Sequence, residues 1–79
     1  MEYTIVKFQN EDANKLVGIA ISLNGHGFVS DERIPLIAGK SDEDYVKDAI
    51  AQAQPEIDAW QAQFAVVGKK WNPQTNSFQ

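Results

Sequence analysis

The residues with the most obvious chemical potential lie in the segment SLNGHGFVSDERIP, residues 22–35. This segment holds the single histidine of the chain, His26. Histidine is the side chain best suited to proton transfer near neutral pH. Asp31 and Glu32 follow it and are candidates to orient its ring, as a catalytic triad requires. The segment therefore raises one hypothesis, a small enzyme or ligand-binding protein that uses His26 with nearby carboxylates.

The surrounding sequence favours a turn over a reactive loop. The chain has no cysteine, and none of the serines at 22, 30 and 41 lies in a G-x-S-x-G motif. Neither glycine-rich phosphate-binding pattern is present. Asn24–Gly25, in contrast, is a strong hairpin signal, because both residue types accept the positive φ of a type I′ turn. We therefore predict that His26 lies at the tip or first rung of a hairpin, that there is no catalytic residue, and that the protein is not an enzyme.

The carboxylates do not have the spacing of a metal site. One histidine and no cysteine leave no zinc pattern, and the D-x-[DN]-x-[DN]-G calcium loop is absent. The acidic run Asp42, Glu43 and Asp44 has a local explanation. Ser41 is a good N-cap, Asp44 stands three residues later as in a capping box, and acidic residues suit the positive end of a helix. We expect neither a metal nor a cofactor.

The first 40 residues have the patterns of short strands. Tyr3–Gln9 and Lys15–Leu23 alternate with the period of a strand, and strand character resumes at Phe28–Val29. Gly18 inside the second strand indicates a bulge or a close approach by a neighbouring element. We expect Asp31–Lys40 to be an extended connection across the core. The predicted core face of the second strand comprises Val17, Ile19, Ile21 and Leu23.

Helical periodicity follows Ser41, with Pro55 inside it. Because proline removes a helical hydrogen bond, we predict a break or kink near Gln54–Pro55 and a second helix that starts at Pro55. Gly68 would end that helix, with Lys69 and Lys70 at its negative end. The predicted core seam is Val46, Ile50, Ala53, Ile57, Trp60, Phe64 and Val67.

These patterns predict an α+β fold in a single domain, residues 1–79. Its antiparallel sheet would have about three strands, built from β-hairpins, with one kinked or two consecutive helices packed on one face.

Charge is distributed unevenly along the chain, whose net charge is −4. Residues 31–58 carry eight acidic and three basic residues, a net −5, whereas residues 59–79 carry only Lys69 and Lys70, a net +2. The acidic segment disfavours direct nucleic-acid binding and would attract a basic protein surface. No apolar run is long enough to span a bilayer, and the N-terminus lacks the features of a signal peptide, so we expect no membrane association and a cytoplasmic location.

The tail has the sequence WNPQTNSF, with a turn expected at residues 72–75 between Trp71 and Phe78. Whether these residues form a hairpin or a coil stays open. The pattern resembles the short turn-bearing endings of small bacteriophage tail and accessory proteins. This resemblance covers eight residues of 79, implies a phage or prophage origin, and transfers no functional residue.

We interpret the chain as a small acidic, non-enzymatic interaction protein: an accessory, adaptor or inhibitor that docks on a larger protein. Inhibition of a host nucleic-acid-binding enzyme by a phage protein is its most concrete version. Trp60 continues the core seam, whereas Trp71 is the expected exposed anchor. A homodimeric assembly protein is a further alternative, so both monomer and homodimer stay open. The predicted partner-binding residues are Asp42, Glu43, Asp44, Asp48 and Trp71.

Overall fold

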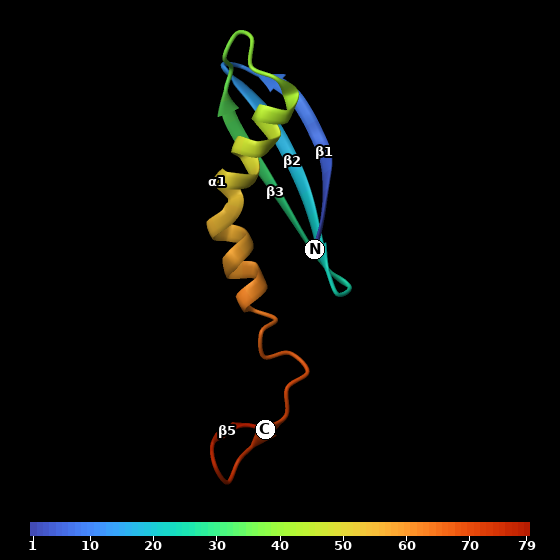
Figure 1. The fold of residues 1–79 in the computed structure, drawn as a ribbon, viewed down its shortest axis with the longest axis vertical. Helices are drawn as coiled ribbons and strands as arrows, with labels where there is room; N and C mark the ends of the chain where they lie inside the picture. The colour runs from blue at the N-terminus through green and yellow to red at the C-terminus, as the bar shows by residue number, and fades with distance from the viewer.

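The computed structural model describes all 79 residues and consists of a three-stranded sheet, one long helix and a protruding C-terminal segment (Figure 1). The sheet is antiparallel with strand order β1-β2-β3, and α1 lies over β2 and β3 on one face. The α+β prediction is confirmed. The elements are β1 (Glu2–Glu11), β2 (Asn14–Leu23), β3 (His26–Pro35), α1 (Asp42–Ala62), β4 (Trp71–Asn72) and β5 (Ser77–Phe78).

Two tight turns connect the three long strands. Asn24 and Gly25 have φ values of 50° and 82°, the positive pair that a type I′ turn requires. Leu23 pairs with His26, so His26 forms the first rung of the hairpin, as predicted. The β1–β2 turn contains Asp12, whose φ is 54°. Asp tolerates this left-handed conformation better than most residues.

Gly18 lies where the sheet is most crowded. The pairing of β1 with β2 shifts between Ile5 and Lys7, which leaves Val6 as the extra residue of a β-bulge. A Cβ atom on Gly18 would lie 2.8 Å from the Lys7 Cβ and 3.0 Å from the Asp31 Oδ1. Both features that the sequence indicated, a bulge and a close approach, are therefore present, the bulge in the neighbouring strand.

The core lies between α1 and the faces of β2 and β3. The predicted core face of β2 is confirmed, because Val17, Ile19 and Ile21 are almost fully buried and Leu23 packs against them. Ala49 and Ala53 of α1 are fully buried, and their small side chains let the helix backbone approach the sheet closely. The buried residues of α1 are Tyr45, Ala49, Ala53, Ile57 and Trp60.

The predicted seam is wrong in the first half of the helix and at the seam's last residue, Val67, which is exposed and lies beyond the end of α1. Tyr45 and Ala49 face the core in the first half, whereas Val46 and Ile50 lie one position round the helix and are only partly buried. A spacing of three or four residues does not distinguish two adjacent stripes on a helix. The close contact that alanine allows decides which stripe meets the sheet.

The predicted second helix is also wrong, because α1 runs without interruption through Pro55. Proline cannot bond to the carbonyl four residues earlier, which belongs to Ala51. Both residues lie on the exposed side of α1, where water can satisfy that carbonyl. At 1.5 Å per residue, the 21-residue helix is about 32 Å long.

The helix ends earlier than predicted, at Ala62. Residues 63–68 form successive turns in which four of the amides, those of Gln63, Phe64, Ala65 and Val67, bond to a carbonyl three residues back, and Gly68 closes them with a φ of 87°. Lys69 and Lys70 lie beyond these turns and do not contact a helix end, contrary to the prediction.

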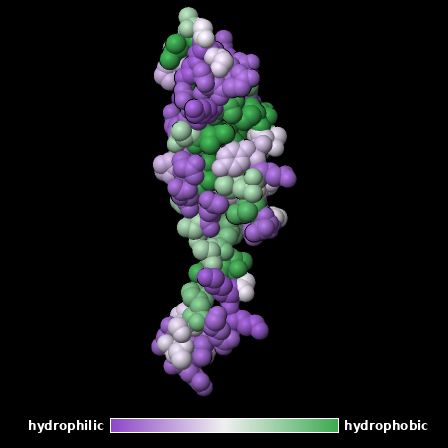
Figure 2. Space-filling model, viewed as in Figure 1, coloured by the Kyte–Doolittle hydropathy of each residue, from purple (hydrophilic) through white to green (hydrophobic).

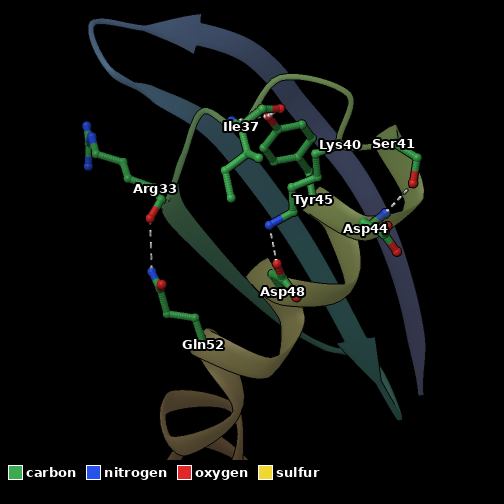
Figure 3. Close-up of polar contacts among 8 residues, drawn as sticks. All are labelled: Arg33, Ile37, Lys40, Ser41, Asp44, Tyr45, Asp48 and Gln52. Carbon is green, nitrogen blue, oxygen red and sulfur yellow. Dashed lines mark hydrogen bonds and ion pairs between the residues drawn. The ribbon is translucent and has the colours of Figure 1, made fainter.

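The Asp31–Lys40 connection was predicted as extended, and its first half is part of β3. The loop that follows is fixed to α1 by the buried Tyr45. Its hydroxyl accepts a hydrogen bond from the Ile37 amide at 2.9 Å and donates to the Ile37 carbonyl at 3.1 Å (Figure 3). The Leu36 amide donates to the Ala13 carbonyl at 2.9 Å, which joins this loop to the β1–β2 turn.

Residues 63–79, the C-terminal arm, extend away from residues 1–62, the body (Figure 1). The molecule measures 61 × 19 × 18 Å and has a radius of gyration of 17.2 Å. A compact chain of this length has a radius of gyration of about 12 Å. The sequence left a hairpin or a coil open for the tail; a two-rung hairpin forms, in which Trp71 pairs with Phe78.

Candidate docking site

The site begins at the N-terminus of α1, where the sequence predicted a capped, acidic first turn. Ser41 has extended backbone dihedrals, and its hydroxyl accepts a hydrogen bond from the Asp44 amide at 3.2 Å (Figure 3). This is the expected N-cap contact. Asp42, Glu43 and Asp44 occupy the first turn and are exposed. The capping interaction therefore fixes where three carboxylates reach solvent.

The acidic residues differ in whether a cation already neutralises them. Asp48 forms an ion pair with Lys40, whose side chain is largely buried and also lies over the Tyr45 ring (Figure 3). The carboxylates of Asp42 and Glu43 form no hydrogen bond or ion pair, and neither does that of Asp44. The first turn of α1 is thus the part of the acidic run that keeps its charge available.

On the sheet face opposite α1, by contrast, carboxylates are paired across the central strand. Lys7 reaches Asp31 at 3.1 Å, and Arg33 reaches Glu11 at 2.8 Å. The hydrogen bond from Arg33 to Glu11 and the charge of that carboxylate raise the pKa of Arg33 above its ordinary value. These exposed ion pairs link the edge strands β1 and β3 across the central strand β2. They leave little uncompensated charge on the sheet face opposite α1.

A shallow depression of about 520 Å³ lies beside the acidic turn. Val46 and Ile50, the two residues displaced from the predicted seam, provide its apolar surface. We call this depression the α1–β1 groove because it lies on the flank of α1 opposite the flank bonded to β3 through Gln52, and all of its lining residues belong to α1. Five residues line it: Asp42, Glu43, Val46, Lys47 and Ile50.

β1 adds exposed apolar surface on the same side of the sheet as α1. Tyr3 and Ile5 pair with Ile21 and Ile19, and cross-strand partners share a face. They nevertheless remain 37% and 39% exposed, because α1 covers β2 and β3 and leaves β1 open. Val6, in the bulge, is 51% exposed. Figure 2 shows hydrophobic side chains at the surface of the face that carries α1.

His26 does not meet the carboxylates that the enzyme hypothesis requires. Its ring stacks on Phe64, with ring centroids 3.9 Å apart and an interplanar angle of 18°. Asp31 and Glu32 lie five and six residues along β3, which is about 17–20 Å at the rise of a strand. His26 is therefore an aromatic packing partner that joins the β2–β3 turn to the end of α1.

Glu32, which the sequence suggested only as a partner for His26, is a buried carboxylate that contacts α1 instead. The Ser30 hydroxyl donates a hydrogen bond to Glu32, and the Gln52 amide donates to its other oxygen at 3.2 Å. Glu56 lies 3.2 Å from the same serine hydroxyl. Period-2 alternation places residues 30 and 32 on the face toward α1, so their polar character there was the available signal. The cluster fixes the position of α1 on β3.

Trp71 is far from the acidic turn, in the C-terminal arm. It is 53% exposed and packs edge-on against Phe78, with ring centroids 5.2 Å apart. The structure therefore does not bring Trp71 together with Asp42, Glu43, Asp44 and Asp48 within one chain. Trp60, in contrast, is buried against Phe28, as predicted.

Comparison of the chain with protein-family models, curated proteins and solved structures gave no match. No group of three or more histidine, cysteine, aspartate or glutamate side chains is arranged to hold a metal ion. No helix has both the length and the apolar composition needed to cross a membrane.

Proposed function

We propose that this protein acts by docking on a larger protein through the α1–β1 groove and its acidic rim, as an accessory, adaptor or inhibitor. The observation that carries the proposal is the combination of exposed apolar surface with two unneutralised carboxylates. Val46 and Ile50 supply the apolar surface, and Asp42 and Glu43 supply the charge. Contiguous apolar surface with a polar rim is typical of protein-interaction sites.

The groove defines the chemistry of the partner. A segment with apolar side chains to cover Val46 and Ile50, flanked by lysine or arginine to face Asp42 and Glu43, is complementary to it. Complementary charge steers association and suppresses wrong partners more than it adds affinity. Binding through this site should therefore weaken as salt concentration rises.

A more specific version follows from the same charges. Basic surfaces of nucleic-acid-binding enzymes recognise phosphates, and a row of carboxylates can occupy such a surface in their place. Asp42, Glu43 and Asp44 are exposed, close together and held by a capped helix start. We propose inhibition of such an enzyme, by a protein of phage origin in the host cytoplasm, as the concrete form of the docking function.

The test compares proteins captured from the lysate of the source organism by three immobilised full-length chains. These are the wild type, Asp42→Asn/Glu43→Gln, and the control Glu2→Gln/Asp12→Asn, which removes two exposed charges elsewhere. Partners of the site are retained by the control and lost, about tenfold or more, by the groove variant, as expected for two charge contacts. Capture that is equal for all three chains at low salt would contradict the proposal.

A further inference from the structure

The C-terminal arm and the α1–β1 groove are complementary surfaces of one chain. The arm contains no acidic side chain, and its net side-chain charge is +2, from Lys69 and Lys70. Apart from Phe64, which packs on His26, its large apolar residues lack cover, with Trp71 53%, Phe78 47% and Val67 61% exposed. The groove offers the converse, apolar side chains beside Asp42 and Glu43, two carboxylates against the single cation of Lys47. Each surface has what the other lacks.

We infer that, in the free protein, the C-terminal arm of one copy lies in the α1–β1 groove of a second copy, and reciprocally. The arms then close both grooves until a larger partner displaces them. This inference rests on the proposed function in that it assigns the occupant of the same groove before the partner arrives.

The direction of the arm favours a second copy over its own groove. The groove lies on the first half of α1, and the arm leaves from Ala62, about 24 Å further along the helix from Val46. The turns of residues 63–68 continue away from the body, so the hairpin lies beyond the end of α1 (Figure 1). A return to its own groove would require these turns to unwind.

The dimensions suit a reciprocal exchange. The molecule is 61 Å long whereas α1 is only about 32 Å long, and the arm extends the molecule beyond the C-terminal end of the helix (Figure 1). Two copies placed side by side with their helices antiparallel would each lay an arm along the body of the other. Such an arrangement has twofold symmetry and sets the helix dipoles in opposition.

The available area indicates a dimer that a partner can open. Two half-exposed aromatic side chains and two half-exposed valines offer on the order of 300 Å² of arm surface. Because the groove is shallow and lined by only five residues, two reciprocal contacts would bury less than about 1,200 Å² when both sides are counted, below the range of stable interfaces. We therefore expect association in the micromolar range.

The first test is sedimentation velocity of the full chain over roughly 1–100 µM, a range centred on micromolar affinity. The wild type should pass from monomer to dimer, and Trp71→Ala/Phe78→Ala should stay monomeric. The matched control Gln74→Ala, whose side chain forms no hydrogen bond in the same hairpin, should behave as the wild type. A wild type that is monomeric throughout, or a double variant that still dimerises, would overturn the inference.

A charge exchange tests the pairing of the two surfaces. Lys69→Glu/Lys70→Glu alone and Asp42→Lys/Glu43→Lys alone should each dimerise at least tenfold more weakly, because each places like charges at the contact. An equimolar mixture of the two chains should restore a dimer, since the basic groove of one then meets the acidic arm of the other. Failure of the mixture to associate, with both chains folded by circular dichroism, would refute the charge pairing.

The absence of cysteine allows the contact to be located directly. A Gln74→Cys chain mixed with a Lys47→Cys chain should form an interchain disulfide much faster than with a Ser22→Cys chain, because Ser22 lies on the face opposite α1. Equal rates would refute docking in the groove. If the wild type stays monomeric yet captures partners through Asp42 and Glu43, the exchange of arms is refuted and the proposed docking function stands.

Discussion

The body and the C-terminal arm contain similar aromatic residues, but the tryptophan is buried in the body and exposed in the arm. Each contains an aromatic pair, Phe28 with Trp60 in the body and Trp71 with Phe78 in the arm. Trp60 is 7% exposed because it lies between α1 and β3, whereas Trp71 is 53% exposed because only its own hairpin contacts it. The body completes its core with residues distant in sequence. The arm does not.

This difference indicates that the body determines the stability of the protein, whereas the arm is available for binding. An isolated two-stranded hairpin is marginally stable in water and gains little from its own contacts. The hairpin of the arm, residues 71–78, should therefore add almost nothing to the free energy of unfolding of the monomer, whereas mutations in the body and at Phe64, which packs on it, should dominate that quantity. The arm's exposed aromatic residues are instead available to a second surface.

The largest expected effect comes from a cavity in the body. Ile57→Ala removes a fully buried side chain and should lower the free energy of unfolding by about 2–5 kcal/mol. For a chain of this size that is most or all of the total. Phe78→Ala, in the arm, should change it by less than about 0.5 kcal/mol at monomeric concentration. Urea denaturation followed by circular dichroism measures the free energy of unfolding of both variants. A comparable loss in the two would contradict the expectation that the body, and not the arm, determines stability.

The next effect concerns the crowded centre of the sheet. Gly18→Ala places a Cβ atom 2.8 Å from the Lys7 Cβ, a backbone-proximal atom that cannot rotate away. We expect a loss of about 1–3 kcal/mol, the usual result of overpacking. Gly27→Ala is the control, because its Cβ would meet nothing within 4 Å. Thermal unfolding of the two variants should therefore differ by several degrees.

A smaller effect is expected at the helix start. Ser41→Ala removes the acceptor for the Asp44 amide and should cost about 1 kcal/mol. Ser77→Ala, whose hydroxyl contacts only Thr75 in the arm, should leave the unfolding midpoint of the body in urea unchanged. Hydrogen exchange should show the loss at Ser41 as faster exchange in the first turn of α1. A Ser41→Ala variant with wild-type exchange there would argue against a capped acidic turn.

The smallest effect on stability is expected on the face of the sheet opposite α1. A double-mutant cycle on Lys7 and Asp31, each changed to alanine, should give a coupling energy of about 0.2–1 kcal/mol. Because both side chains are exposed, the coupling should fall further as salt rises. A salt-independent coupling above that range would mean that this face is buried by something in solution, and so would contradict an assignment of docking to the other face.

Local chemistry made much of the body predictable. The Asn24–Gly25 turn, the Ser41 cap and the apolar face of β2 depend on neighbouring residues and on period-2 alternation, and all three are confirmed. The continuity of α1 through Pro55 was not predictable, because it depends on which side of the helix meets solvent. That choice is made by packing against the sheet.

The candidate site was predictable only in part. Asp42, Glu43 and Asp44 could be found from the sequence because a capped helix start fixes their exposure. The groove beside them could not, because it depends on a rotation of the helix that buries Ala49 and leaves Val46 and Ile50 only partly buried on the flank of α1 away from β3. The predicted partner residues nevertheless fall on two surfaces, one at the start of α1 and one in the arm.

If the groove beside α1 receives the C-terminal arm of a second copy, loss of the arm's aromatic side chains must change the surroundings of Val46 and Ile50. Methyl-detected NMR tests this most directly, by comparing the wild type with Trp71→Ala/Phe78→Ala at the same high concentration. We expect the methyl resonances of Val46 and Ile50 to differ between the two proteins and those of Val29, exposed on the opposite face of the sheet, to stay unchanged. Identical Val46 and Ile50 resonances in the two proteins would contradict docking of the arm in the groove.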